Sequence, residues 1–337
     1  MAVTARDVAQ RVGVSVSTVS RALTRPDMVS PITRRRVAEA ANELGYHANL
    51  AARSLSTGRA SHIGLVIPDL ENPFFASVAK GVQSYARQIG YAVFIADTDE
   101  NPAQETELVS QLSPQVDGVI LCSPRSESEV IYQLIGKTPL VLLNRPLDGI
   151  NSISLDSADG IQQAIRHLWA LGHRIIGYAG GPRASWSNQV RQESFHQAMS
   201  ADATMQAVDL GHFLPFNDGG LAAGDLALAS GVTAVIAFND LMAIGLIRRL
   251  RSRGLRVPED LSVVGFDGID QSAYCSPALT TVVGGLRQLG RSAVDALLNP
   301  PMPPTENLLP VDLIVRASTA EASQSPANAQ ARATTQS

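Results

Sequence analysis

The apolar positions of the first 46 residues recur three or four residues apart in three short segments, which is the spacing of one face of an α-helix. Ser15 stands where a side chain can cap the second helix, and Ser30-Pro31 begins the third. Gly13 and Gly45 stand where the first and third helices would end. Two short helices joined by a turn that contains glycine are typical of DNA-binding proteins. The pattern therefore predicts a three-helix DNA-binding head.

The same spacing separates inward from outward positions in these helices. In the third helix, Val37, Ala38, Ala41 and Leu44 are expected to face inward. Val16 lies off the apolar stripe of the second helix and is therefore expected to be exposed.

From residue 62 onward, short continuous apolar strands alternate with amphipathic helices. Ile63–Ile67 is the first strand, Phe75–Ile89 is the first helix, and the last strand of the alternation is Leu261–Phe266. Continuous apolar strands are typical of parallel sheets that are buried on both faces. The alternation falls into two sets, and the second begins after a helix at Asp156–Leu171. It predicts a doubly wound α/β core of two sheets, with a ligand cleft at the carboxyl ends of the strands.

Composition agrees with a head and a folded core. The chain has 337 residues, of which 45% are hydrophobic, so a sizeable core is expected and global disorder is excluded. No apolar run approaches the roughly 18 residues of a membrane helix, and the N-terminus has no apolar signal-peptide segment. Cys122 and Cys275 are too few for a disulfide scaffold, and the six histidines have no metal-binding spacing. We expect a cytoplasmic protein with no membrane partner, no metal and no cofactor.

The charges are segregated along the chain. The net charge is −4, yet residues 1–61 carry nine arginines and no lysine against four acidic residues, a net charge of +5. The remaining residues hold 18 basic and 27 acidic groups, a net charge of −9. A basic head that contacts a polyanion, joined to an acidic core that does not, fits this distribution.

Several motifs carry a resemblance to a known family. The segments Thr4–Ala9 and Gly13–Arg21 closely resemble the helix-turn-helix of the lactose-repressor/galactose-repressor (LacI/GalR) family. The match continues through Leu44–Tyr46 and the hinge Asn49–Leu55, and it then covers nearly the whole chain to about Arg316. The resemblance implies a transcription factor whose core has the type I periplasmic-binding-protein fold.

The resemblance and the chemistry of the residues together imply contacts between the second helix and DNA. Val16 would touch a thymine methyl, Ser17 would bond a base donor or acceptor, and Arg21 would bind a guanine in the major groove. Hydroxyl side chains would position the head on phosphates: Thr4, Ser15, Thr18 and Ser20. Thr4 and Ser15 could serve only as helix caps, although the two roles can coexist.

The hinge is similar to the family segment that becomes helical on operator DNA. By that resemblance Asn49 begins this helix, Leu55 inserts into the minor groove, and Ala52 allows close approach to the DNA. A helix this short is marginal by itself in water, so its folding can depend on how two hinges are held together. The alternative is an ordinary flexible linker.

The expected organisation has four parts. They are a helix-turn-helix domain at 1–48, a hinge helix and linker at 49–60, an effector-binding and dimerisation core at 61–318, and a disordered tail at 319–337. The core divides into an N-subdomain of about 61–156 and 284–312, and a C-subdomain of about 157–283 with the last strand. The tail has no leucine heptads, so a homodimer is expected rather than a coiled-coil tetramer.

The resemblance also implies an effector site. Family contacts map onto residues of aromatic, hydroxyl, amide and charged type: Phe74, Phe75, Asn144, Ser187, Arg191, Asn239 and Asp267. Trp186 is expected to line the same pocket, with a packed core indole as the alternative. Phe216 is aligned with the aromatic wall of the family, although Phe213 competes for that place.

The chemistry of these side chains suits a polyol. Asp267 can accept two hydroxyl hydrogen bonds, Arg191 and Asn239 offer planar donors, and aromatic rings cover apolar sugar faces. We therefore expect a sugar effector, with a purine or nucleoside as the second choice because Phe74 and Phe75 could also sandwich a base. Arg191 and Asp267 could instead form a simple ion pair.

Motifs of catalysis do not appear in the sequence. Gly180-Gly181 and Gly284-Gly285 fit neither the dinucleotide nor the P-loop pattern, and there is no GxSxG motif. We therefore expect no enzyme, but a homodimeric repressor that binds near-palindromic double-stranded DNA under effector control. A solute-binding protein without a DNA role is the rival, against which the arginine-rich head argues.

Overall fold

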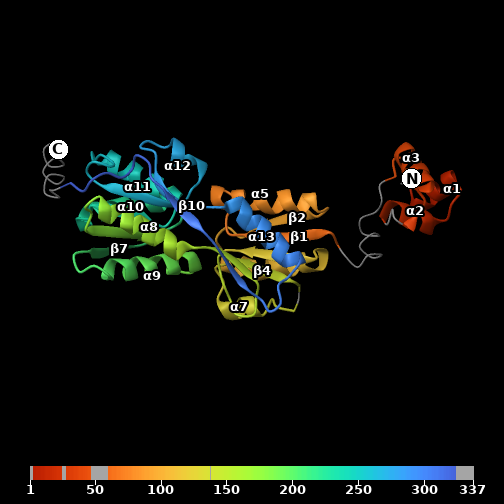
Figure 1. The fold of residues 1–337 in the computed structure, drawn as a ribbon, viewed down its shortest axis with the longest axis horizontal. Coiled ribbons are helices and arrows are strands. Elements are labelled where there is room, and N and C mark those ends of the chain that lie inside the picture. Colours follow the sequence, from red (N-terminus) through yellow and green to blue (C-terminus); the bar gives the residue numbers. More distant parts are fainter. Residues whose placement is uncertain (1–2, 25–27, 47–59, 137, 324–337) are drawn as a thin grey trace. The chain divides into compact units, whose positions relative to one another are not determined.

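The computed structural model describes residues 3–24, 28–46, 60–136 and 138–323. The chain divides into two compact units, a head formed by the N-terminal residues and a core that begins at His62 (Figure 1). The head contains α1 (Ala5–Val12), α2 (Val16–Thr24) and α3 (Pro31–Leu44).

Capping interactions fix the ends of the head helices. The backbone N–H and the hydroxyl of Thr4 both donate to a carboxylate oxygen of Asp7, at 2.8 and 2.7 Å. The hydroxyl of Ser15 accepts the backbone N–H of Thr18 at 3.1 Å, at the start of α2. Gly13 ends α1 with a φ of 73°, a left-handed conformation that glycine adopts without steric cost. The predicted caps and glycine stops are confirmed.

The three helices of the head pack around a small apolar centre. Val8, Val19 and Val37 have no exposed surface, and Ala40 and Ala41 cover them from α3. The expectation that Ala38 faces inward was wrong, because Ala38 is exposed. The inward stripe of α3 runs instead through positions 37, 40, 41 and 44, which keeps the three-and-four spacing of one helix face.

The first lobe of the core is a six-stranded sheet in the order β11-β5-β4-β3-β1-β2, with every pair parallel. Its strands are β1 (His62–Ile67), β2 (Ala92–Asp97), β3 (Gly118–Cys122), β4 (Leu140–Leu143), β5 (Ser152–Leu155) and β11 (Glu306–Leu309). Its helices are α5 (Pro73–Gln88), α6 (Pro102–Leu112), α7 (Ser128–Tyr132) and α13 (Leu286–Leu298). Strands β1 and β3 are almost wholly buried because helices cover both faces of the sheet.

The second lobe repeats this architecture in the order β12-β10-β9-β8-β6-β7, with only the β10–β12 pair antiparallel. Its strands are β6 (Ile175–Gly180), β7 (Gln206–His212), β8 (Ala234–Ala237), β9 (Ser262–Asp267), β10 (Thr280–Gly284) and β12 (Val311–Ile314). Its helices are α8 (Ser157–Ala170), α9 (Trp186–Ser200), α10 (Asn217–Ser230), α11 (Asp240–Ser252) and α12 (Asp270–Tyr274). The two sheets with their helices confirm the predicted doubly wound α/β core.

The chain passes between the lobes three times. It leaves the first lobe after β5, returns after β10, and crosses again between β11 and β12 (Figure 1). The three connections lie together, so each lobe can shift relative to the other only by bending these segments. Among the described residues, no helix is long and apolar enough to cross a membrane.

Helices α10 and α11 pack closely through glycines. A Cβ added at Gly245 would collide with the backbone carbonyl of Asn217, and one added at Gly220 would collide with that of Met242. These two contacts leave no room for any side chain between the helix backbones. The close approach fixes the start of α11, which carries Asn239 and Asp240 toward the cleft.

Candidate functional site in the cleft and candidate DNA interface

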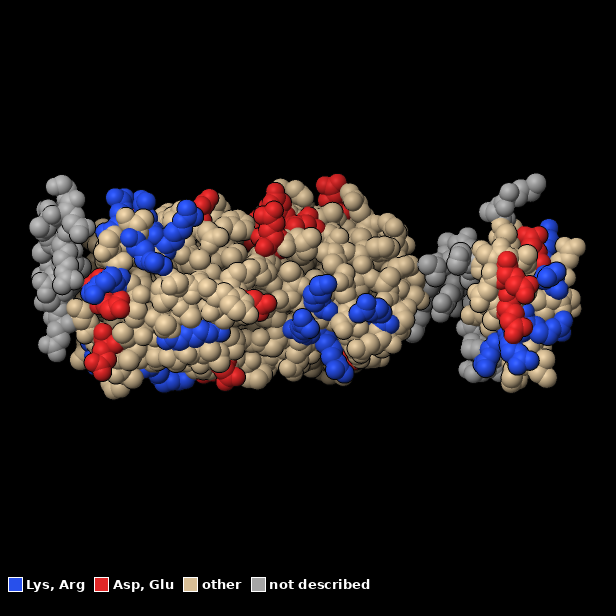
Figure 2. Space-filling view, turned by 90° about the horizontal axis from the view of Figure 1, so that it is seen from above, with Lys and Arg blue, Asp and Glu red and all other residues tan. Residues whose placement is uncertain are grey.

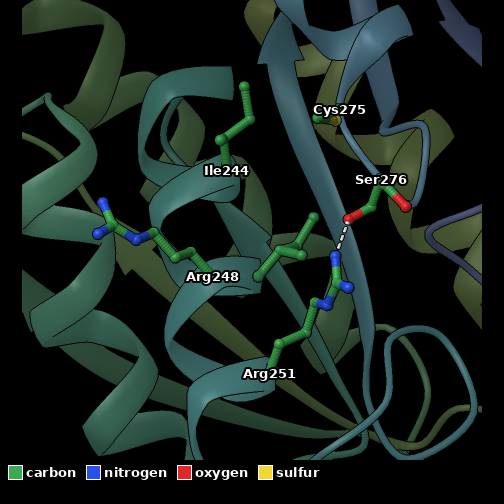
Figure 3. A pocket seen from close by; sticks show the side chains of 6 residues that line it. Ile244, Arg248, Arg251, Cys275 and Ser276 are labelled. Atoms are coloured by element: carbon green, nitrogen blue, oxygen red, sulfur yellow. Dashed lines mark hydrogen bonds between the residues drawn. The ribbon is translucent and has the colours of Figure 1, made fainter.

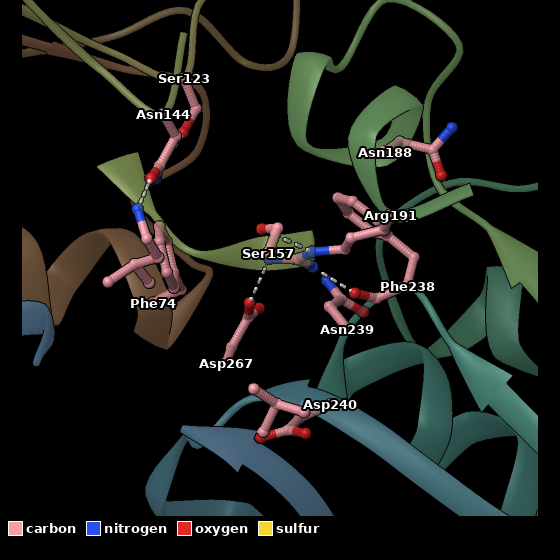
Figure 4. Close-up of polar contacts among 12 residues, drawn as sticks. Phe74, Ser123, Asn144, Ser157, Asn188, Arg191, Phe238, Asn239, Asp240 and Asp267 are labelled. Carbon is pink, nitrogen blue, oxygen red and sulfur yellow. Dashed lines mark hydrogen bonds and ion pairs between the residues drawn. The ribbon is translucent and has the colours of Figure 1, made fainter. Parts of the chain in front are cut away.

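A pocket of about 370 Å³, including its open mouth, lies between the two lobes of the core. Its walls come from the ends of strands β1, β2, β3, β4, β6, β7, β8 and β9 or from the segments that follow them, as the strand-end rule predicts. The residues that line it are Asn72, Phe74, Phe75, Glu100, Ser123, Arg125, Asn144, Ser185, Ser187, Arg191, Pro215, Phe238, Asn239 and Asp267. Figure 4 shows the polar side chains of both lobes directed toward one another.

The aromatic wall comes from the start of α5. The side-chain oxygen of Asn72 accepts the backbone N–H of Phe74 at 3.0 Å and thereby caps this helix, and Pro73 occupies its first position. The rings of Phe74 and Phe75 lie edge to face, with centroids 5.1 Å apart at 89°. Perpendicular neighbouring rings cannot enclose one planar base between parallel faces, but each can cover an apolar surface.

Arg191 is the central cation of the pocket. It comes from α9 and is 96% buried. Its guanidinium donates to the Phe238 carbonyl, to the Ser157 hydroxyl at 3.4 Å and to the Asp267 carboxylate at 3.5 Å, and its Cζ lies 3.5 Å from the centroid of the Phe266 ring. The sequence alternative of an Arg191–Asp267 ion pair is thus present, but its long contact leaves each group able to bond a ligand.

Two buried carboxyl groups lie behind this cation. Burial raises the pKa of Asp267 to about 7, although the adjacent Arg191 opposes the shift. Burial, and then the charge of Asp267, raise the pKa of Asp240 to about 8. Asp240 accepts the Ile269 backbone N–H at 2.9 Å and the Thr281 hydroxyl at 2.5 Å. It therefore joins the ends of β8, β9 and β10 beneath the pocket.

Of the three asparagines that line the pocket, Asn144 and Asn239 are, like Asn72, largely engaged by the protein. Asn239 caps α11 by accepting the Met242 backbone N–H at 2.9 Å, and its amide donates to the Pro215 carbonyl at 2.9 Å. Asn144 accepts the Leu155 backbone N–H at 3.1 Å and donates to the Ser123 hydroxyl at 3.3 Å (Figure 4). Each amide keeps one N–H for a ligand.

Backbone strain is concentrated at this pocket. Four of its lining residues that are not glycine have positive φ: Glu100 at 55°, Ser123 at 47°, Asn144 at 53° and Asp267 at 109°. Such conformations are rare away from glycine and cluster at binding sites, where the surrounding structure compensates for them. This concentration supports a ligand-binding role for the cleft.

Trp186 and Phe216, which were expected to line this pocket, are not among its lining residues. The ring of Trp186 is half-buried, and its centroid lies 5.8 Å from Cζ of Arg145. Phe216 is half-buried at the start of α10, where its neighbour Pro215 reaches the pocket. Of the expected effector residues, Phe74, Phe75, Asn144, Ser187, Arg191, Asn239 and Asp267 are brought together.

A second pocket lies on the second lobe, away from the cleft (Figure 3). Helix α11 contributes Ile244, Ile247, Arg248 and Arg251, and the segment after α12 contributes Cys275 and Ser276. Arg251 donates to the Ser276 carbonyl at 2.7 Å. Its lining residues all belong to the second lobe, so this pocket is not part of the cleft between the lobes.

In the head, the start of α2 presents hydroxyl groups and one exposed apolar side chain. The Ser15 hydroxyl lies 2.7 Å from that of Ser17 and 2.8 Å from that of Thr18. Val16 is 44% exposed, as predicted from its place off the apolar stripe. Arg21 is exposed and forms no ion pair within the described residues. Exposed methyl, hydroxyl and guanidinium groups on one helix are the types that contact bases and phosphates.

Other charges of the head are partly paired. Arg11 contacts Glu43 at 3.2 Å, and Arg35 contacts Glu39 at 3.8 Å. Figure 2 shows the acidic side chains of the head gathered in a stripe with arginines beside it. The hinge residues Asn49, Ala52 and Leu55, for which DNA contacts are expected, lie outside the described residues.

The comparisons with known proteins agree with this geometry. Residues 4–49 match the family of bacterial regulatory proteins of the lacI type, and residues 165–319 match the periplasmic binding protein-like domain. The transcriptional repressor CytR of Escherichia coli K12 is 33% identical over 330 residues, which cover 94% of this chain and 96% of CytR. The chain belongs to the LacI family. Within that family it is a DNA-binding transcriptional repressor, and the predicted resemblance is confirmed.

Solved LacI-family structures share the fold over nearly the whole length. A lac repressor dimer bound to operator and the anti-inducer ONPF superposes with a TM-score of 0.86 at 30% identity, covering 95% of this chain and all of that chain. The regulator CelR in complex with cellobiose superposes with a TM-score of 0.70 at 30% identity, covering 94% of this chain and 99% of that chain.

Sequence reasoning missed several polar residues of the pocket in this LacI-family protein. Arg125 and Glu100 form a buried ion pair through two contacts of 2.7 and 2.9 Å, and Ser123 and Ser185 also line the cleft. Ser123 directly follows β3, and Glu100 follows β2 by three residues. Their position after strand ends was a signal that could have identified them.

Proposed function

We propose that this protein binds a near-palindromic operator as a homodimer and that a small molecule in the cleft of the core controls its affinity for DNA. The observation that carries the proposal is the pocket itself, because its polar groups come from both lobes and from strained backbone positions. A ligand that bonds both lobes stabilises one arrangement of them by its differential affinity. The lac repressor dimer on its operator, which this chain resembles over 95% of its length, supports the dimeric assembly.

The effector we propose is a sugar or sugar derivative. Asp267, Arg191 and the free N–H groups of Asn144 and Asn239 suit neighbouring hydroxyl groups. The edge-to-face arrangement of Phe74 and Phe75 favours covering one apolar sugar face over sandwiching a purine. The cellobiose complex of the relative CelR supports the same class.

The proposed action is regulation in the cytoplasm, where the DNA target lies, without turnover of the effector. The relatives that match the chain are transcriptional regulators. Recovery of unchanged sugar after prolonged incubation with the protein is the result that this proposal requires, whereas a product would support an enzyme.

The DNA-reading role of α2 is tested by Arg21→Ala. We expect this substitution to weaken operator binding by about 1–3 kcal/mol and to relax preference at one base pair, because a guanidinium can bond two acceptors of guanine. The measurement is a binding titration on the operator and on single-base variants at fixed salt. Arg87→Gln, an exposed substitution in the core, is the control. Equal weakening on operator and random DNA would exclude base reading by Arg21.

The effector role of the cleft is tested by Asp267→Asn. We expect this variant to lose the rise in melting temperature that a sugar screen produces in the wild type, since the carboxylate can no longer accept two hydroxyl hydrogen bonds. Operator binding without sugar should stay within about twofold, because the head is a separate unit. The matched control is Asp270→Asn, an exposed carboxylate three residues away. A full sugar response in Asp267→Asn would move the effector site elsewhere.

A further inference from the structure

Besides Arg125 and Arg191, a third arginine, Arg145, lies at the edge of the cleft, and it differs from these two in having no carboxylate within 4 Å among the described residues. Arg145 follows β4 in the first lobe, and it is 93% buried. Its guanidinium lies over the ring of Trp186, the first residue of α9 in the second lobe. The side chain therefore reaches from one lobe to the other.

The site of Arg145 adjoins the effector pocket on both sides. In the first lobe, the preceding residue Asn144 lines the pocket. In the second lobe, Ser185 and Ser187, which flank Trp186, line it as well. A ligand held by Arg191 and Asp267 could extend a substituent toward this edge without leaving the cleft.

The charge of Arg145 is not balanced by the described residues. Arg125 has Glu100 at 2.7 Å and Arg191 has Asp267 at 3.5 Å, but no carboxylate within the described residues lies within 4 Å of Arg145. Within the part of the chain that the structure describes, its one hydrogen bond is to the Ser128 hydroxyl at 3.1 Å, and its buried Nε has no partner. Burying a cation without a counter-charge is costly, so such groups are generally paired or serve a ligand.

The nearby carboxylates act on Arg145 only at longer range, because none of those in the described residues contacts its guanidinium. The two oxygens of Glu105 accept the backbone N–H groups of Arg125 and Ser126, at 2.6 and 3.0 Å. Glu127 and Glu129 are exposed at the start of α7. Burial lowers the pKa of Arg145, the charges of Glu127 and Glu105 oppose this shift, and the charge of Arg125 adds to it.

We propose that Arg145 binds an anionic substituent of the effector, a carboxylate or a phosphate ester, at the edge of the cleft beside Ser128 and Trp186. The planar guanidinium fork can donate two parallel hydrogen bonds to either group, and both groups neutralise its charge. Because Arg145 of the first lobe lies over Trp186 of the second, an anion held there lies where the two lobes meet. This inference rests on the proposed effector role of the cleft and assigns its ligand to acidic or phosphorylated sugars.

The test compares neutral sugars with their charged counterparts on the full-length protein. The probes are glucose, glucuronate and glucose 6-phosphate, then ribose and ribose 5-phosphate, and finally inorganic phosphate. Binding of each probe is measured by the shift in melting temperature and by calorimetric titration. We expect charged probes to raise the melting temperature of the wild type more than neutral ones. The carboxylate and phosphate arms distinguish the two sources of the anion.

Arg145→Gln should weaken binding of the preferred charged probe about tenfold or more, while binding of a neutral sugar changes by less than twofold. Arg145→Lys should retain part of the preference, since it keeps the charge but loses the fork. The matched control Arg87→Gln, an exposed cation of the same lobe, should leave every probe unaffected. The free Arg145→Gln protein should melt at or above the wild type, because the substitution removes an unbalanced buried charge.

Three results would overturn the inference: equal binding of neutral and charged probes, no response to any anionic probe, or equal losses in Arg145→Gln and Arg87→Gln. A free Arg145→Gln protein that melts well below the wild type would assign Arg145 a structural role instead. Failure of the broader effector proposal has a different signature, because Asp267→Asn would then retain the response to every probe. The two failures are therefore distinguishable in one set of titrations.

Discussion

At the scale of single residues, Asp267 combines features that are unfavourable for folding and useful for binding. Its backbone has a φ of 109°, and its carboxyl group is 93% buried beside Arg191 and above Asp240. Strain and desolvation of this kind persist only where the surrounding structure compensates for them. The network of Asp240, Ile269 and Thr281 supplies that support from below.

The buried pair of carboxyl groups predicts an unusual pH dependence of stability. The pKa of Asp240 is raised to about 8, so between pH 4 and pH 8 the folded state keeps a proton that the unfolded state has lost. The free energy of unfolding therefore falls as the pH rises through this range, by up to about 1.4 kcal/mol per pH unit for one proton. Asp240→Asn should show a shallower fall between pH 5 and pH 8 in urea unfolding.

The control for this pH prediction is Asp270→Asn, which removes an exposed carboxylate near the same site. Its stability should follow the wild-type slope. Parallel curves for Asp240→Asn and the wild type would contradict a protonated Asp240 in the folded state.

Residue identities in the pocket divide into those that sequence could predict and those that it could not. Phe74, Arg191 and Asp267 were expected from motifs, and the structure brings them to one pocket. Arg145 was not expected, because its importance lies in what surrounds it: an unpaired Nε and an indole from the other lobe. Motifs record residue types, whereas the absence of a partner is a property of three-dimensional packing.

At the scale of helices and strands, the sequence was most informative where apolar runs are continuous. The bounds of strands β1 and β9 lie within one residue of the expected ranges, because each strand is buried on both faces. Strand β7 was not expected, because it lies at the edge of its sheet and most of its residues are exposed or half-buried. The polar residues Gln206, Asp209 and His212 interrupt this strand, so it has no continuous apolar run to reveal it.

Helix contacts depend on glycines whose role the sequence leaves undefined. Gly245 of α11 lies against the carbonyl of Asn217, the first residue of α10, and leaves no space for a methyl group. We expect Gly245→Ala to destabilise the protein by about 1–3 kcal/mol or more, because the two helix backbones must separate. The measurement is the melting temperature of the full-length variant. Arg248→Ala, an exposed change on the same helix, should leave it nearly unchanged.

The same Gly245 substitution has a functional consequence at the level of helix α11. Because Asn239 and Asp240 stand at the start of α11, separation of α10 from α11 would displace them toward the pocket. Sugar binding by Gly245→Ala should therefore weaken more than its operator binding. A variant that melts with the wild type would contradict the close packing of these helices.

At the scale of the whole molecule, two units with opposite net charge are joined in one chain: a head that carries the helix proposed to read DNA and a core that carries the pocket. Charge segregation and the head motif predicted this division, because they are readable without tertiary structure. The coupling between the units is an energetic quantity. Its size depends on how differently the effector binds the two arrangements of the lobes, which neither composition nor topology specifies.

That coupling must be reciprocal, and reciprocity is the prediction that tests the molecule as a whole. If the sugar selected by screening changes operator affinity by a given factor, saturating operator must change sugar affinity by the same factor. We expect a factor of about 5 to 150, which corresponds to about 1–3 kcal/mol. Operator affinity is measured with and without sugar, and sugar affinity with and without operator, in one buffer because DNA binding depends steeply on salt. Random DNA lacks the paired half-sites of the operator, so it should leave sugar affinity nearly unchanged. A change in one affinity without an equal change in the other would mean that the sugar acts outside the cleft-to-head linkage, for example by competing with DNA on the head itself.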